Sequence, residues 1–334
     1  MEDNKHTQED LKRLQNLDLE SKINITLTRI LEWYIKNDDE VYISFSGGKD
    51  STVLADLAAR ICKIRNCKLI LWFSDTGLEY PEVRNHVKVY GEYLKEKHDV
   101  EVETIMEYPK DRKTGERITF KEVVLNHGYP IISKTISRAI GDVKKLGDNC
   151  WFAGAFNGRE TGVYNMQKWK YVLDAPFKVS NKCCDIMKKN PAKYFTKDTG
   201  LKPIIGTMAY ESRNRKNQWL KTGCNSFDAK NPASKPLSFW LEQDVLEYIV
   251  KFNIPYPSVY GEIIQDKKGK YYVTGVDRTG CVFCGYGCHL QKEPNRFQQL
   301  KTTHPKLWNY CMKPVDEGGL GMREVLEYIN VKVE

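Results

Sequence analysis

The sequence predicts an α/β protein built on a doubly wound, mostly parallel sheet with flanking helices, followed by a cysteine-rich, less regular C-terminal part. Short runs of apolar, β-branched and aromatic residues recur at 41–45, 68–74 and 100–106. Stretches with helical spacing of apolar residues separate these runs, which is typical of parallel strands joined by crossover helices. Residues 275–292, in contrast, are rich in glycine and cysteine.

Helices and strands are expected to alternate in the first third of the chain. Apolar side chains at roughly helical spacing predict a helix over residues 8–37, before the first strand. The segment 52–62 (TVLADLAARIC) is predicted to be the helix that follows this strand. A further helix over 80–97 has Pro81 and Glu82 in its first turn, where both residue types are favoured.

The second half of the chain is less regular. Residues 202–206 (KPIIG) are predicted to form another core strand, followed by a helix over 211–220. Residues 236–252 predict a helix with an apolar face, and prolines and a glycine then interrupt regular structure. The tail, 305–331, is expected to be helical in pieces around a Gly-Gly pair.

The composition is that of a soluble globular protein. Of the 334 residues, 41% are hydrophobic and 29% are charged, so a core can form without disulfides. The N-terminus has no apolar signal segment, and no run approaches the length of a membrane span, so we expect a cytoplasmic protein without a membrane partner. Ten cysteines in a reducing compartment then indicate metal ligation or redox chemistry.

The charge balance is mildly basic. The formal net charge of +8, from 52 basic and 44 acidic residues, suits a nucleotide or nucleic-acid partner, but a lysine-rich solvated surface explains it equally well. Trp169 beside Lys168 and Trp219 near Arg215 could stack on bases, although such residues more often pack at the edge of a core.

A strand that ends in Ser46-Gly-Gly-Lys-Asp-Ser51 and leads into a helix has the properties of a phosphate-binding loop. Glycines allow the backbone to approach an anion closely, and the helix directs free N–H groups and its positive dipole end toward that anion. The serines can donate hydrogen bonds, Lys49 adds a positive charge, and Asp50 could cap the helix or hold Mg²⁺ through water. The loop is not a Walker A motif, because Ile43 and Asp50 stand where that motif requires glycine and Ser or Thr. The alternative is a glycine-rich turn without a ligand.

The SGGKDS segment closely resembles the PP-loop of the ATP pyrophosphatase superfamily. Residues 75–82 (DTGLEYPE) and 211–215 (ESRNR) are similar to the corresponding segments of the phosphoadenosine phosphosulfate (PAPS) reductase family. The segment 236–257, with Trp240, Asp244 and Tyr248, fits the same pattern. The resemblance extends over most of the chain, from before the loop to the last Cys-rich segment.

This resemblance implies a Rossmann-like nucleotide site at the carboxyl edge of the sheet. It places Asp75 beside the nucleotide, and Arg215 as a clamp on a phosphate or sulfate, with a surface salt bridge as the equally weighted alternative for Arg215. Lys49, Asp50 and Arg215 are the implied catalytic residues. The residues implied to hold the phosphate or pyrophosphate are Ser46, Gly47, Gly48, Lys49, Asp50 and Ser51.

The cysteines form a second pattern, because the adjacent Cys183 and Cys184 are followed much later by Cys281 and Cys284 in a C-x-x-C. Each half alone is ambiguous between redox, zinc and chance. Together they resemble the cluster-binding pattern of assimilatory adenylylsulfate (APS) reductases, which implies that all four thiolates hold a [4Fe–4S] cluster. Zn²⁺ is the main competitor, but adjacent ligands would strain a tetrahedral site.

The resemblance departs from sulfonucleotide reductases at the C-terminus. Those enzymes carry a catalytic cysteine in a Glu-Cys-Gly-Leu-His-type segment, whereas the last residues here are YINVKVE. Cys288 with His289 could substitute for that nucleophile, and Cys288 could equally be a ligand, a sulfur carrier or a buried apolar residue. Cys224 has the same ambiguity.

The favoured hypothesis is an ATP pyrophosphatase that forms an adenylate for sulfur transfer, with ATP, Mg²⁺ and a [4Fe–4S] cluster. In this it resembles the ATP pyrophosphatase component of DNA phosphorothioation systems and other nucleic-acid thiolation enzymes. Nucleic acid, a sulfur-donor protein such as a cysteine desulfurase, and further copies of the chain are compatible partners. The alternatives are a PAPS or APS reductase that releases sulfite, and a non-catalytic nucleotide- or nucleic-acid-binding subunit with a structural metal.

Three parts of the chain are expected on this basis. They are an N-terminal helical segment (1–37), a PP-loop, PAPS reductase-like domain (38–255), and a Cys-containing C-terminal region (256–334) packed on that domain.

Overall fold

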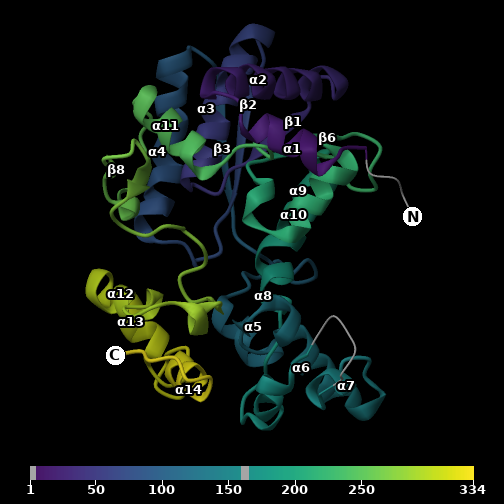
Figure 1. Ribbon diagram of the computed structural model, residues 1–334, viewed down its shortest axis with the longest axis vertical. Helices are drawn as coiled ribbons and strands as arrows, with labels where there is room; N and C mark the ends of the chain where they lie inside the picture. Colours follow the sequence, from purple (N-terminus) through teal and green to yellow (C-terminus); the bar gives the residue numbers. More distant parts are fainter. Residues whose placement is uncertain (1–4, 159–164) are drawn as a thin grey trace. The chain divides into compact units, whose positions relative to one another are not determined.

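The computed structural model describes residues 5–158 and 165–334. The chain folds into two compact units, and each combines segments that lie far apart in the sequence (Figure 1). Unit 1 consists of Met1–Asp75, Glu79–Glu107 and Ala192–Gly280. Unit 2 consists of Thr76–Leu78, Tyr108–Pro191 and Cys281–Glu334. The three-part division predicted from the sequence stays a prediction.

Unit 1 contains the central sheet, whose strand order is β3-β2-β1-β5-β7-β6. All neighbouring pairs from β3 to β7 are parallel, and only β6 runs antiparallel to β7. This mostly parallel sheet with flanking helices confirms the predicted fold class. The strands are β1 (Val41–Ser44), β2 (Leu69–Ser74), β3 (Val102–Glu107), β5 (Lys202–Ile205), β6 (Asn225–Ser226) and β7 (Ala233–Ser234).

The strand order reverses at β1. From β1 the chain adds β2 and β3 on one side, and only after it has passed through unit 2 does it add β5 on the other side. The loops that follow β1 and β5, the two strands on either side of this reversal, leave the sheet in opposite directions. The crevice between two such loops is where doubly wound proteins bind ligands. The loop after β1 is the SGGKDS segment, and the loop after β5 leads to Arg215.

Both faces of the sheet are covered. Val41, Ile43 and Phe45 point into the main hydrophobic core, which they share with α2, α3, α4 and α11. On the opposite face Tyr42 packs edge-on against Phe195 of α9, with ring centroids 4.9 Å apart. This alternation explains why the strand is apolar along its whole length. The helices of unit 1 are α1 (Gln8–Gln15), α2 (Leu19–Lys36), α3 (Lys49–Arg65), α4 (Pro81–His98), α10 (Arg213–Thr222), α11 (Glu242–Lys251) and most of α9 (Asn190–Thr199).

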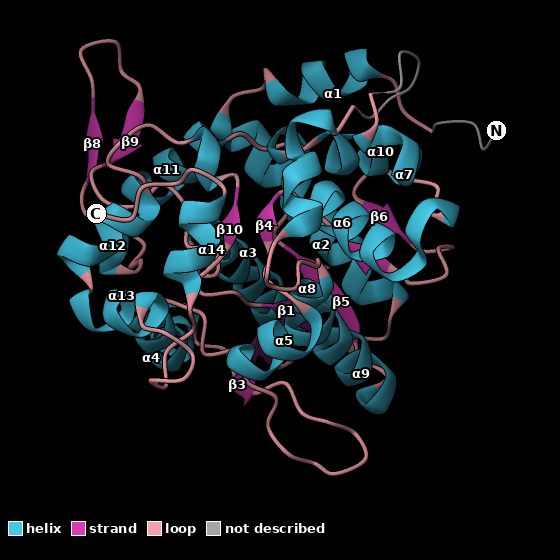
Figure 2. Cartoon of the chain, turned by 90° about the horizontal axis from the view of Figure 1, so that it is seen from below, coloured by secondary structure: helices cyan, strands magenta, loops and turns pink. Residues whose placement is uncertain are grey.

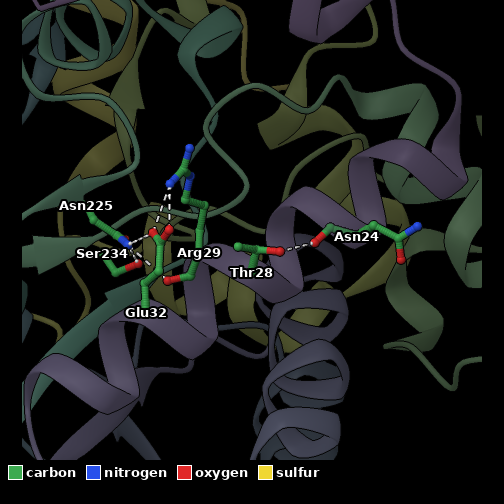
Figure 3. Close-up of polar contacts among 6 residues, drawn as sticks. All are labelled: Asn24, Thr28, Arg29, Glu32, Asn225 and Ser234. Atoms are coloured by element: carbon green, nitrogen blue, oxygen red, sulfur yellow. Dashed lines mark hydrogen bonds and ion pairs between the residues drawn. The ribbon is translucent and has the colours of Figure 1, made fainter.

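Polar contacts fasten the edge of the sheet to α2 (Figure 3). The Asn225 side-chain amide of β6 donates to Arg29 O at 3.0 Å and to Glu32 Oε2 at 3.3 Å. Its carbonyl oxygen accepts from Ser234 Oγ at 2.6 Å. A short edge strand whose polar side chains are engaged in this way is protected from pairing with another chain.

Two predicted helices differ from the structure. The helix predicted over 8–37 is divided into α1 and α2, because Asp18 caps the second helix through Ser21 N at 2.9 Å. The helix predicted from residue 236 begins only at Glu242, since Asp244 accepts from Leu241 N at 2.6 Å and fixes the start there. The tail is helical in pieces, as expected.

Unit 2 is mainly helical. Its two-stranded parallel sheet pairs β4 (Ile131–Ile132) with β10 (Gly285–Tyr286), and so joins the two halves of the unit. None of the described helices combines the length and the apolar character that a bilayer crossing requires. The helices of unit 2 are α5 (Phe120–His127), α6 (Lys134–Leu146), α7 (Ala153–Phe156), α8 (Lys182–Cys184), α12 (Arg296–Thr303), α13 (Pro305–Met312) and α14 (Met322–Tyr328).

The pH dependence of stability should include a contribution from His86. This side chain is buried in α4, 3.0 Å from Thr52 Oγ1, and burial lowers its pKa from 6.5 to about 4. The unfolded state therefore binds the extra proton first, and the free energy of unfolding should fall as pH decreases from 6.5 toward 4, by up to about 3 kcal/mol. Urea denaturation of the wild type and His86→Gln across this range checks it. The variant should show the shallower pH dependence, and equal slopes would contradict the assignment.

Candidate functional site

The conformation and close packing of the loop after β1 favour glycine at position 47. Gly47 has φ +70°, and a Cβ at this position would lie 2.6 Å from Val87 Cγ2 and 2.9 Å from Val83 Cγ1. Helix α4 therefore packs directly against the loop backbone. A side chain at position 47 would be strained and would push the loop away from the sheet.

The N-terminus of α3 is not capped by a side chain of the loop. Gly48 is the N-cap residue and makes no side-chain cap hydrogen bond. Ser51 Oγ donates to Gly48 O at 3.0 Å and lies 3.0 Å from Ser46 Oγ, so the two serines brace the loop, and neither of these hydrogen bonds caps an amide of the first turn. Uncapped amides at a helix N-terminus form a site that favours anions.

Lys49 is a buried cation at this helix end. Its Nζ atom lies 3.0 Å from Glu242 Oε1 and donates to Asp277 O at 3.0 Å. Burial lowers the pKa of Lys49, but the charges of Asp50, Tyr260 and Glu242 outweigh burial, and the net shift is upward. The ammonium group is therefore kept charged beside the loop.

Asp50 follows in the first turn. Burial raises its pKa to about 6, Lys49 opposes this shift, and the charges of Glu211 and Glu242 add to it. Its Oδ1 atom is buried without a hydrogen-bond partner among the described residues. A carboxylate oxygen of this kind is a suitable ligand for Mg²⁺. Across the described ranges, however, no group of three or more His, Cys, Asp or Glu side chains is arranged to hold a metal ion.

Arg215 lies on α10, beyond the carboxyl end of β5. It forms an ion pair with Glu211, whose other oxygen is 3.9 Å from Arg278 Nη1. Glu211 Oε2 also accepts from Met208 N at 2.9 Å, which fixes the carboxylate in place. Arg215 thus forms a salt bridge, the alternative to a phosphate clamp that the sequence left open, and the clamp stays a prediction.

Asp75 follows β2, the strand beside β1. Its Oδ2 atom accepts from Arg84 Nε at 3.0 Å and from Arg84 Nη2 at 2.7 Å. Its buried Oδ1 atom has no hydrogen-bond partner within the described part of the chain. The carboxylate is therefore fixed by one oxygen and leaves the other available to a ligand.

The sequence did not single out several residues that surround the loop. Arg84 lies one turn into α4, and its role depends on the distance to Asp75, which no motif shows. Glu242, Tyr260, Asp277 and Thr279 come from segments without a recognised phosphate motif. The Lys49 N–H donates to Tyr260 Oη at 3.2 Å, and this hydroxyl lies 2.7 Å from Thr279 Oγ1.

The four cysteines of the pattern all belong to unit 2. Cys183 and Cys184 lie on α8, which continues into a π-helical turn, η3 (Asp185–Lys189), a feature frequent at functional sites. Cys281 and Cys284 form a turn closed by Cys284 N donating to Cys281 O at 3.1 Å, next to the β4–β10 pair. The Cys183 pKa is raised by its hydrogen bond with Cys184, by burial, and by the charges of Cys184, Cys284 and Cys281. Among the described residues, however, these four thiols are not arranged as a group that could hold a metal ion, so their role as ligands stays a prediction.

Basic side chains surround this group of thiols. Cys184 has its pKa lowered to about 6, first by the hydrogen bond with Cys183 and then by the charges of Lys134, Lys188 and Lys189. Cys284 has its pKa raised to about 12 by burial and by Cys281, and Arg296 opposes the shift. A set of four cysteines beside cations is chemically suited to a [4Fe–4S] cluster or to Zn²⁺.

Cys288 has a different character. Its thiol is buried and donates to Gly285 O at 2.9 Å, and burial raises its pKa to about 11. It is therefore a protonated thiol at neutral pH, which argues against a thiolate nucleophile here. Cys224 is likewise buried, with Ser238 Oγ 3.5 Å from its sulfur.

Comparisons with known proteins identify a family for this chain. The phosphoadenosine phosphosulfate reductase domain matches residues 40–155 and 159–285, a range that includes the loop and all four cysteines. Comparison with curated protein sequences gives no significant match. Among solved structures, the U34-tRNA thiolase NcsA from Methanococcus maripaludis with its [4Fe-4S] cluster is similar at 14% identity and a TM-score of 0.35, over 94% of this chain and 83% of that one.

Proposed function

Since the chain belongs to the phosphoadenosine phosphosulfate reductase domain family, we propose that it is an ATP pyrophosphatase-type enzyme that forms an adenylate for sulfur transfer. The observation that carries this proposal is the N-terminus of α3, whose N-cap residue Gly48 makes no side-chain cap, with the buried, cationic Lys49, at the point where the strand order reverses. This arrangement suits a leaving pyrophosphate, which carries several negative charges.

The proposed reaction begins when an oxygen atom of the acceptor attacks the α-phosphorus of ATP. The bond to the β-phosphate oxygen breaks, and pyrophosphate leaves into the Ser46–Ser51 loop, where the α3 amides and Lys49 stabilise its charge. Asp50 would hold Mg²⁺, which neutralises charge on the phosphates when it is bound. A sulfur nucleophile then attacks the acceptor atom that carries the adenylated oxygen; a bond to sulfur forms, the bond to that oxygen breaks, and AMP leaves with the oxygen.

The four cysteines would hold the [4Fe–4S] cluster in unit 2. Such a cluster, when bound, can carry or position sulfur, or it can be structural. The contribution of the chain is the donor set Cys183, Cys184, Cys281 and Cys284, with Lys134, Lys188 and Lys189 balancing its negative charge.

Nucleic acid is the acceptor class that the charge distribution favours. Residues 108–191 contain 16 of the 52 basic and 8 of the 44 acidic residues, which leaves 36 of each sign in the rest of the chain. The entire formal charge of +8 therefore resides in this segment of unit 2. Trp169 and Trp219 are buried, but Trp151 in the same basic segment is 65% exposed and could stack on an unpaired base.

The proposal predicts which product forms. Protein purified without oxygen is given Mg-ATP with RNA or DNA, and separately PAPS or APS with thioredoxin, and both pyrophosphate and sulfite are measured. We expect pyrophosphate and AMP from ATP, increased by the correct nucleic acid, and no sulfite, because Cys288 is a protonated thiol. Release of ADP and phosphate, or of sulfite alone, would contradict the proposal.

A further inference from the structure

The groups of the phosphate loop that would bind an anion are already engaged by residues 259–280. The Lys49 N–H donates to Tyr260 Oη at 3.2 Å, and Lys49 Nζ donates to Asp277 O at 3.0 Å. A Cβ built on Gly48 would lie 2.9 Å from Thr279 Oγ1 and 3.1 Å from Tyr260 Oη. The two hydroxyls therefore lie in the hollow that Gly48 leaves open beside the helix N-terminus.

Both hydroxyls belong to one excursion of the chain. It begins at η5 (Ser258–Tyr260), continues through the β8–β9 hairpin (Ile263–Gln265 and Tyr271–Val273), and returns to Thr279. Figure 2 shows this hairpin extending from the neighbourhood of α11. Its base is closed by Gly275 N donating to Tyr260 O at 2.8 Å. Tyr260 and Thr279 are therefore carried by a common base and are expected to move together.

We propose that the hydroxyls of Tyr260 and Thr279 occupy the position in the loop where pyrophosphate would bind, and that an incoming pyrophosphate group displaces them. This inference rests on the proposed function. The bond from Lys49 N–H to the Tyr260 hydroxyl joins two neutral groups, whereas a phosphate oxygen would accept a charge-assisted bond of roughly twice the strength. The helix dipole favours the anion further. The exchange is therefore favourable for a multiply charged anion and unfavourable for a neutral ligand.

The exchange lowers affinity by the strength of the bonds that it breaks. Tyr260 is 2% exposed, so its hydroxyl cannot turn toward water while the segment stays in place. Binding must therefore open the contact between Tyr260 and Thr279 and the contact to Lys49. Without the Tyr260 hydroxyl, the same anion would bind without breaking either bond.

The test is titration calorimetry of Mg²⁺ and inorganic pyrophosphate into the wild type, Tyr260→Phe and Tyr256→Phe. Tyr260→Phe keeps the ring, whose centroid is 5.2 Å from Lys49 Nζ, and removes only the hydroxyl. It should bind pyrophosphate about two- to tenfold more tightly, the worth of a net hydrogen bond. Tyr256 is the matched control, because its hydroxyl donates to Gly261 O at 3.1 Å rather than to a group of the loop. Thr279→Val is a second variant and should also tighten binding.

The outcomes separate this inference from the proposed function. Weaker binding of pyrophosphate by Tyr260→Phe would mean that the hydroxyl is a phosphate ligand, and unchanged binding would mean that it does not occupy the pyrophosphate position. Either result would overturn the proposed exchange. Release of pyrophosphate from ATP would still leave the proposed function standing. Tighter binding without release of pyrophosphate from ATP, whatever the acceptor, would support the exchange and reject the proposed function. General destabilisation would not tighten binding, so a merely structural role of Tyr260 is excluded by the expected result.

Discussion

Replacement of Lys49 by alanine should reduce the rate of pyrophosphate release by a factor of about 100 to 1,000, the usual effect of removing one charged or hydrogen-bonding group from a transition-state site. The ammonium is buried, it is held beside the loop by Glu242 and Asp277, and its pKa is raised, so it is a fixed positive charge where pyrophosphate would leave. Alanine removes that charge and leaves the α3 amides in place. Steady-state kinetics with Mg-ATP and the acceptor nucleic acid would measure the effect.

The matched control for this variant lies on the same helix. Lys63 is in the last turn of α3, where it is exposed and pairs with Asp99 at 2.5 Å. Lys63→Ala should retain wild-type turnover, because surface ion pairs contribute little to stability and Lys63 does not contact the loop. If Lys49→Ala, correctly folded by circular dichroism, turned over at the wild-type rate, the loop would not be the pyrophosphate site.

Replacement of Cys281 by serine should abolish the iron–sulfur cluster that we propose for unit 2. Protein purified without oxygen is expected to contain about four iron and four sulfide ions per chain and to absorb visible light, and the variant should contain almost none. The physical reason is that each of the four proposed cysteine ligands would bind one iron, so the loss of one thiolate would leave an iron without its protein ligand. Metal analysis and visible spectroscopy provide the measurement.

Cys67→Ser serves as the control for the cluster prediction. Cys67 is half-buried in unit 1, where its pKa is linked to that of Cys62, and it belongs to a different group of thiols. This variant should keep the full iron content. If the wild type contained one zinc ion per chain and Cys281→Ser lost it, the site would bind zinc and not a cluster. If Cys281→Ser retained its iron, Cys281 would not be a ligand.

Much of the fold could be predicted because its signals are local. The strand 41–45, the glycines after it and the following helix are adjacent in the sequence, and apolar periodicity identifies each of them. The errors arose where a single capping side chain decided the boundary. Asp18 interrupts a long apolar pattern, and Asp244 starts α11 after a segment whose apolar residues also suit a helix.

The surroundings of the loop could not be predicted in the same way. Tyr260 and Glu242 reach Lys49, and Thr279 reaches Tyr260 beside it, from positions roughly two hundred residues further along the chain. Their residue types are ordinary for core and surface positions. Arg84 is a similar case, since its pairing with Asp75 depends on how α4 is placed beside the end of β2. Motifs identify residues whose chemistry is unusual, whereas these residues become significant only through the fold.

The interleaving of the two units has a consequence for how the chain folds. Val41 of β1 pairs with Lys202 of β5, so this central pairing joins strands separated in the sequence by the large segment of unit 2. During synthesis the β1 edge at the centre of the sheet stays open until β5 has left the ribosome, after the basic segment has already emerged. Contacts of such long sequence separation slow folding and leave an unpaired edge exposed to other chains. The nascent chain thus depends on protection from aggregation before its phosphate loop has been assembled.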